Sequence, residues 1–152
     1  MNWDLATNEI IKFVYGAQSM KIEYKSVKNF TEEQLERLFR SVDWVSANYA
    51  DRLVKAMANS DTVVSAWANG ELIGLVNVLD DGALTAYIHY LLVDPRYQRN
   101  GIASEMIGML KEKYKDYLYL ILIAENKEVV RFYEKMNFQT EEGAVPMAIC
   151  HF

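Results

Sequence analysis

Three apolar segments between residues 62 and 93 are separated by connections too short to contain a crossover helix. Asn69-Gly70 lies between segments 62–68 and 71–79, and Asn-Gly is the preferred dipeptide of two-residue type I′ hairpin turns. Asp81-Gly82 lies between the second segment and residues 84–93. Because such short connections join only antiparallel neighbours, the sequence predicts a three-stranded antiparallel meander.

The meander leads directly into the start of a helix. Pro95 ends the third strand because proline cannot donate to a ladder. Small and polar residues over 98–104 then lead into a helical pattern of apolar positions. A helix start presents unpaired N–H groups and a positive dipole end, and Gly101 and Ala103 lack the bulk to block it. We therefore predict a phosphate site made of backbone here, with positive charge from Arg96 and Arg99.

The remaining segments continue the alternation of strand and helix patterns. Thr31-Glu32-Glu33-Gln34 is a capping box, which predicts a helix start. The run 117–123 is continuously apolar, which indicates a strand covered on both faces. The other expected elements are a strand over 21–27, a helix over 48–58, a helix after Asn126, and short strands near 138–142 and 144–151.

The first twenty residues differ in pattern from the rest of the chain. Leu5, Ile10, Ile11, Phe13 and Val14 have the spacing of a short amphipathic helix. We therefore expect an N-terminal extension over residues 1–20, helical in part, followed by a single domain over 21–152.

Two motifs resemble those of the GNAT superfamily of acetyl-CoA-dependent N-acetyltransferases. Motif A of that family reads Gln/Arg-x-x-Gly-x-Gly/Ala, and Gln98, Gly101 and Ala103 occupy its three positions. The run from Asn126 to Phe138 resembles motif B, in which an asparagine precedes a helix bearing Phe/Leu-Tyr-Glu and ending in Gly-Phe. Asn137 stands where the family usually has glycine, and asparagine is the next-best residue for a left-handed helix end.

The resemblance implies an α/β protein with the GNAT fold. A mixed central sheet of about six to seven strands would splay open at the CoA site, flanked by about four helices and the N-terminal helix. The compact layout, with Met147 near its end, is also similar to the small serotonin N-acetyltransferase-like branch of plants and microbes.

The resemblance also implies the reaction, which is transfer of an acetyl group from acetyl-CoA to a primary amine of a small molecule by direct attack. Tyr133 would protonate the departing thiolate, since a tyrosine stays protonated at neutral pH. The main chain of the strand before motif A would pair with the pantetheine arm. The residues implied to bind CoA are Leu91, Leu92, Val93, Gln98, Arg99, Asn100, Gly101, Ile102, Ala103, Ser104, Asn126, Phe132 and Tyr133.

The amine must lose a proton before it attacks, and His89 is the residue we expect to accept it. Tyr87 and His89 are two apart and so face the same side of a strand, and a histidine pKa near 6.5 suits a proton relay. The alternative is a histidine that is exposed or bonded within the sheet. Trp44, Tyr49 and Tyr87 are candidates for the acceptor pocket, although Trp44 equally fits the core between the first two helices.

Composition excludes several other classes. A formal net charge of −5 argues against a general nucleic-acid binder and suits a cationic amine. No apolar run approaches the ~20 residues that span a bilayer, so no membrane segment is expected. A single cysteine, Cys150, fits a reducing cytoplasm, and two distant histidines do not make a zinc site, so we expect no metal.

Alternatives remain open from the sequence. The nearest one is a protein or peptide N-acetyltransferase, and an acyl-CoA-binding regulatory module without turnover comes from a different class. Because many GNAT domains pair through their termini, a homodimer is one expected state of the chain.

Overall fold

The computed structural model describes residues 8–15 and 18–151, with the side chains of residues 20–151. Within this part of the chain six strands form one sheet in the order β1-β2-β3-β4-β5-β6. Neighbouring strands are antiparallel except β5 and β6, which are parallel, so the sheet is mixed as predicted. The strands are β1 (Asn8–Tyr15), β2 (Gln18–Lys25), β3 (Thr62–Ala68), β4 (Glu71–Asp80), β5 (Thr85–Val93) and β6 (Tyr119–Leu122).

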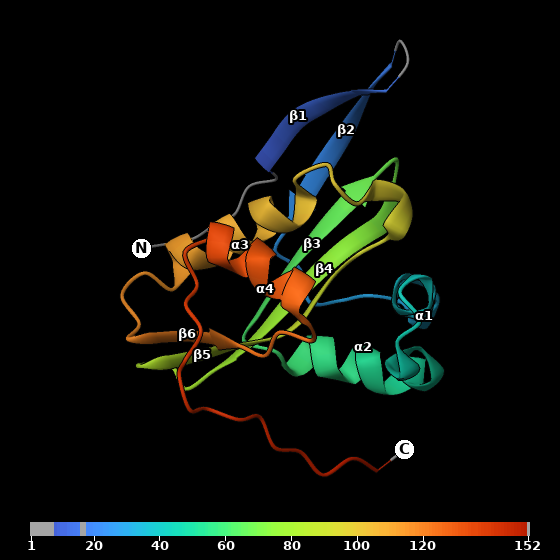
Figure 1. Ribbon diagram of the computed structural model, residues 1–152. Coiled ribbons are helices and arrows are strands. Elements are labelled where there is room, and N and C mark those ends of the chain that lie inside the picture. Colours follow the sequence, from blue (N-terminus) through green and yellow to red (C-terminus); the bar gives the residue numbers. More distant parts are fainter. Residues whose placement is uncertain (1–7, 16–17, 152) are drawn as a thin grey trace.

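Four α-helices cover the two faces of this sheet (Figure 1). Helices α1 (Glu32–Ser41) and α2 (Ala50–Asn59) lie on one face, joined by the short helix η1 (Val45–Tyr49). Helices α3 (Ile102–Lys113) and α4 (Lys127–Lys135) lie on the other, and the short helix η2 (Pro95–Tyr97) precedes α3. The expected α/β layout, a mixed sheet flanked by four helices, is therefore confirmed.

The sheet separates two apolar cores. The core under α3 and α4 includes Val76, Val78 and Ile88, and the core under α1 and α2 includes Leu72 and Leu75. Alternate residues of β4 therefore face opposite cores, which is why this strand is buried along most of its length. The central position of β3 and β4 gives the neighbouring strand β5 a rigid support.

The structure confirms the predictions that rest on residues within a single element or turn. Thr31 Oγ1 accepts the Gln34 N–H at 3.2 Å and Gln34 Oε1 accepts the Thr31 N–H at 3.0 Å, so the predicted capping box is present. Asn69 and Gly70 have φ angles of 49° and 78°, the two left-handed residues that a type I′ turn requires. The predicted three-stranded meander follows as β3, β4 and β5.

The expected N-terminal helix is wrong for residues 8–15, which form strand β1. This strand pairs with β2 from Asn8↔Tyr24 to Tyr15↔Gln18. The apolar positions that suggested a helix are occupied by β-branched and aromatic residues, which favour strands. A short isolated helix is marginal in water, whereas pairing with β2 provides backbone partners on both sides of a register shift between Ile11 and Val14. Leu5 lies outside the described residues.

The expected strands near 138–142 and 144–151 are also wrong, because residues 139–151 contain no strand. Pro146 lies in the middle of the second segment and has no N–H to donate to a ladder. Val145, Met147 and Ile149 are 77%, 93% and 86% exposed, and the segment runs away from the body of the domain (Figure 1).

Strand β6 is an edge strand rather than one covered on both faces. Leu120 and Leu122 pack against the α3/α4 core, whereas Tyr119 and Ile121 are exposed on the opposite face. The continuous apolar run therefore does not indicate burial on both faces here. Among the described residues no helix is long and apolar enough to cross a membrane.

Candidate active site

The N-terminus of α3 presents main-chain N–H groups in a turn with two left-handed residues. Arg99 and Gly101 have φ angles of 63° and 75°, and Gly101 is the N-cap, without a side-chain cap bond. The N–H of Glu105 donates to the Gly101 carbonyl at 2.9 Å, so the N–H groups of residues 102–104 precede the first intrahelical bond. A Cβ at Gly101 would meet no heavy atom within 4 Å. The space and the donors fit a phosphate group.

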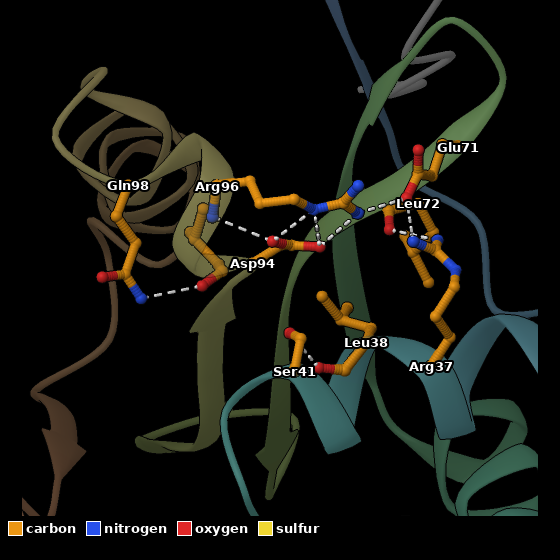
Figure 2. A network of polar contacts seen from close by, with 9 residues as sticks. Arg37, Leu38, Ser41, Glu71, Leu72, Asp94, Arg96 and Gln98 are labelled. Carbon is orange, nitrogen blue, oxygen red and sulfur yellow. Dashed lines mark hydrogen bonds and ion pairs between the residues drawn. The ribbon is translucent and has the colours of Figure 1, made fainter.

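A chain of charged side chains holds this turn against the sheet (Figure 2). The buried Asp94 carboxylate accepts the main-chain N–H of Arg96 at 2.9 Å and its Nη2 at 2.7 Å. Arg96 Nη2 also donates to Glu71 at 2.6 Å, and Glu71 accepts a further bond from Arg37 of α1. The bonds from Arg96 lower the pKa of Asp94. The charge of Arg96 is thus balanced by two carboxylates, although its side chain is 61% exposed. Arg99 is also exposed.

Two polar side chains predicted to bind the cofactor make hydrogen bonds within the turn. Gln98 Nε2 donates to the Val93 carbonyl at 2.9 Å, and Asn100 Nδ2 donates to the Tyr97 carbonyl at 3.0 Å. These bonds link the end of β5 to the start of α3 and leave main-chain groups as the donors of the turn. Of the remaining predicted residues, Ile102 is buried in the core, whereas Ala103 and Ser104 are partly exposed in the first turn.

The end of β5 exposes main-chain groups on the side away from β4. The Asp94 N–H donates to the Ile73 carbonyl at 2.8 Å, so this pair is hydrogen-bonded. Hydrogen-bonded and non-bonded pairs alternate in an antiparallel ladder, which places Leu92 in the next bonded pair. The N–H and C=O groups of Leu91 and Val93 therefore point away from β4. The Val93 carbonyl is the one that accepts the bond from Gln98. On that side β6 pairs only with the first four residues of β5, so the two strands diverge before this point.

A β-bulge in β5 brings aromatic rings together on the α1/α2 side of the sheet. The register with β4 shifts where one residue of β4 lies opposite both His89 and Tyr90. The ring centroids of His89 and Tyr90 are 4.0 Å apart, and Tyr87 lies 5.8 Å from His89. Trp44 extends the row at 5.6 Å from Tyr90. We call Trp44, Tyr87, His89 and Tyr90 the aromatic row.

His89 is the titratable member of the aromatic row. Its side chain is exposed at one edge, while the rings of Tyr87 and Tyr90 lie on either side of it. Burial by these neighbours lowers the pKa of His89 below its ordinary value of about 6.5. The imidazole is therefore neutral at pH 7 and able to accept a proton.

The two candidate pocket residues of the first helical segment differ in position. Trp44 packs against the α1/α2 core and makes an edge contact with Phe39 at 5.9 Å, so its core role and its place in the aromatic row coexist. Within the described part of the chain, the Tyr49 ring is not stacked on or edge-on to any ring of the row. Its ring instead lies 5.1 Å from the Arg52 guanidinium.

An asparagine lies at each end of helix α4. The Asn126 side-chain oxygen accepts the N–H groups of Glu128 and Val129, both at 3.0 Å, so this predicted cofactor residue is a helix cap. Asn137 has a φ of 65°, and the Phe138 N–H donates to the Tyr133 carbonyl at 3.0 Å. These are features of a Schellman motif, and the expected left-handed asparagine at the helix end is confirmed.

Tyr133 is buried in the α3/α4 core, with its ring 5.1 Å from Phe132 and 5.6 Å from Phe138. Burial, with a smaller effect of Glu125, raises its pKa to about 12. Its hydroxyl therefore remains protonated at neutral pH. The Lys111 Nζ of α3 donates to the Met136 carbonyl at 2.8 Å and so ties the end of α4 to α3.

Sequence reasoning missed Tyr90, although the sequence contains a signal for it. Residues 86 and 88 face the α3/α4 core, and after the bulge this core is faced by residues 91 and 93. The apolar positions of β5 thus change from even to odd numbers at His89-Tyr90. No sequence pattern indicates the contacts of Lys111, Arg37 and Glu71, because each contact joins elements that are distant in sequence.

Comparisons with known proteins show the family of the chain. The model of the acetyltransferase (GNAT) family matches residues 26–138. The uncharacterized N-acetyltransferase ycf52 of Pyropia yezoensis is 28% identical over 135 residues, covering 82% of this chain and 77% of the relative.

Solved structures show the same fold. A GNAT family acetyltransferase of Streptococcus pneumoniae superimposes with a TM-score of 0.75 at 24% identity, covering 86% of this chain and 98% of that one. The aminoglycoside N-acetyltransferase AAC(6')-Iy, in complex with CoA, has a TM-score of 0.67 at 14% identity, covering 89% and 99%. The family match spans most of the chain, and the protein therefore belongs to the GNAT family of acetyltransferases.

Proposed function

We propose that this protein transfers the acetyl group of acetyl-CoA to a primary amine of a small molecule by direct attack. The observation that supports this most is that two groups of main-chain hydrogen-bonding atoms, one at the end of β5 and one at the start of α3, follow each other along the chain. The main chain of Leu91 and Val93 faces the side where β6 diverges, and the backbone turn at the start of α3 follows within ten residues. A phosphate-bearing arm fits along this path.

The binding residues follow from their places in the turn. The N–H groups of residues 102–104 would hold the diphosphate, and exposed Arg99 would add positive charge. The main chain of Leu91 and the N–H of Val93 would pair with the amides of the pantetheine arm as an added strand, since the Val93 carbonyl already accepts from Gln98. The side chains of Gln98 and Asn126 would act by bracing the turn and α4, since both are engaged in bonds within the protein.

Acetyl-CoA supplies the acetyl group as a thioester. The neutral amine nitrogen forms a bond to the carbonyl carbon, and the bond from that carbon to sulfur breaks. His89 accepts the proton that the amine releases, directly or through a water molecule. Tyr133 donates a hydrogen bond to the departing sulfur. With a pKa of about 12 it holds its proton more tightly than an ordinary thiol, whose pKa is about 8.5.

The acceptor side of the site is the aromatic row. Aromatic faces attract ammonium groups by cation–π interaction, worth about 0.5–2 kcal/mol. The net charge of −5 also favours the approach of a cationic amine. His89 lies within the row, so an amine bound there is beside the group that would accept its proton.

The test is acetyl-CoA turnover, followed by thiol release, across arylalkylamines, polyamines, aminoglycosides and short peptides, with CoA binding measured by calorimetry. Turnover with one class of small amines is the expected result. Turnover with peptides alone would instead identify a peptide acetyltransferase. CoA binding without any turnover would favour a regulatory module, and no CoA binding would overturn the proposed site.

A further inference from the structure

The bulge in β5 is faced by a buried amide to which the proposed reaction assigns no role. Asn77 of β4 is 1% exposed and lies between two valines whose partners in β5 are residues 91 and 88. Asn77 is therefore the single residue opposite both His89 and Tyr90. A polar side chain at the centre of an apolar sheet is costly unless it is fully bonded.

Both ends of this amide have partners. Asn77 Oδ1 accepts the main-chain N–H of Tyr90 at 2.9 Å, and Asn77 Nδ2 donates to Ser60 Oγ at 2.9 Å. Ser60 Oγ in turn donates to the Ala56 carbonyl in the last turn of α2, at 2.8 Å. Because the Tyr90 N–H can only donate and Ser60 gives its proton to Ala56, the orientation of the amide is determined. A line of hydrogen bonds thus runs from α2 to the bulge.

The bulge determines which side chains of β5 lie on the α1/α2 side of the sheet, where the aromatic row is. In a regular strand, neighbours point to opposite faces, so His89 and Tyr90 would be separated by the sheet. In the structure their rings are stacked at 4.0 Å with an angle of 29° between the planes. A slip of one residue moves a whole side-chain set to the other face. Without an acceptor at residue 77, the buried Tyr90 N–H would be unsatisfied, and a regular register would relieve that cost.

We propose that Asn77 is a positioning residue for acetyl transfer, whose amide oxygen holds the bulge that places His89 beside Tyr90. This rests on the proposed function, because it concerns His89 as the proton acceptor. Asn77 acts only through the main chain of β5. A role limited to stability would leave the place of the His89 ring unchanged.

Three variants separate these roles. Asn77→Leu removes the acceptor at similar size, Asn77→Asp keeps an acceptor oxygen, and Ser60→Ala removes only the second bond of the amide. The chain has two histidines, so proton NMR with His151→Gln as the assignment variant identifies the His89 ring signals. We expect the ring current of Tyr90, stacked at 4.0 Å, to displace these signals. Turnover of acetyl-CoA with the best amine is measured on the same samples.

We expect Asn77→Leu to lose the ring-current displacement and about 10²-fold in kcat, the scale of general base catalysis. Asn77→Asp should keep the displacement and most of kcat. Ser60→Ala should keep both and lower only the Tm. Unchanged His89 signals in folded Asn77→Leu, or a lost displacement with kcat intact, would overturn the proposal.

If Asn77→Leu does not fold, the NMR spectrum of Asn77→Asp tests the proposal. Retained His89 signals then support the proposal, and their loss in a folded variant refutes it. A wild-type chain without turnover would show that the proposed function has failed. The NMR signals would still report separately whether Asn77 holds the bulge.

Discussion

Tyr133 and His89 lie on opposite faces of the sheet. Tyr133 belongs to the core under α3 and α4, whereas His89 stacks on Tyr90, which packs toward α1 and α2. The proposed hydrogen-bond donor and the proposed proton acceptor thus lie on opposite sides of the sheet. We therefore place the proposed reaction where β6 has stopped pairing with β5.

Removing the Tyr133 hydroxyl tests the donor. We expect Tyr133→Phe to lower kcat about 10²-fold with little change in CoA affinity, since only the departing sulfur loses a partner. Tyr24→Phe is the matched control, because Tyr24 is buried in the same core and burial also raises its pKa to about 12. Equal losses in both variants would make the effect one of packing.

The pH dependence of kcat tests His89. Its pKa is lowered, and its neutral form is the proton acceptor, so wild-type activity should rise with pH through a midpoint below about 6.5. His89→Gln should lose this acid limb and most of the rate near neutral pH. His151→Gln, a change at the exposed second histidine, should retain the wild-type profile. A persistent acid limb in His89→Gln would remove His89 from the mechanism.

A charge placed in the turn tests the phosphate site. Gly101→Glu should weaken CoA binding about tenfold or more, which requires only about 1.4 kcal/mol of repulsion. Gly82→Glu matches it closely, because the two glycines have φ angles of 75° and 76° and open space around a Cβ. Both variants should show similar backbone strain in thermal unfolding. Calorimetry that finds wild-type CoA affinity in Gly101→Glu would argue against the site.

The bond between Asp94 and Arg96 should stabilise the fold as well as the turn. Asp94→Asn should lower the free energy of unfolding by about 1.5–3 kcal/mol, the range for a hydrogen bond to a charged group. Glu36→Gln is the control, because Glu36 pairs with Arg40 at the same distance of 2.7 Å but at the surface. That pair should contribute about 0.5 kcal/mol.

The pKa of Asp94 predicts how the difference in unfolding free energy between wild type and Asp94→Asn changes with pH. Its pKa is lower in the folded protein than the ordinary value of about 3.9, so its contribution is present above that value. The contribution is lost as the pH falls through the folded pKa. Urea unfolding of wild type and Asp94→Asn should therefore converge below about pH 4. A constant difference down to pH 2 would contradict the assigned cause.

The elements predicted best are those whose signals lie within a few residues. The turn at Asn69-Gly70, the cap at Thr31 and the left-handed Asn137 depend on backbone preferences that the local sequence carries. The family resemblance rests on equally local motifs, and the family match confirms it. The strand at residues 8–15 was missed because its apolar positions fit a helix as well, and only pairing with β2 separates the two.

The sequence by itself determined the strand–turn–helix order, the glycine-containing turn before α3 and the residue types available for proton transfer. Tertiary structure decided how they are used. Arg96 was expected to serve the phosphate turn, but contacts with Asp94 and Glu71 direct its charge to the sheet. No residue next to Asn77 in the sequence marks its role, because its partner, the Tyr90 N–H, lies across the ladder. Such choices depend on contacts between segments far apart in the chain, which form only when the sheet and its two helical layers pack.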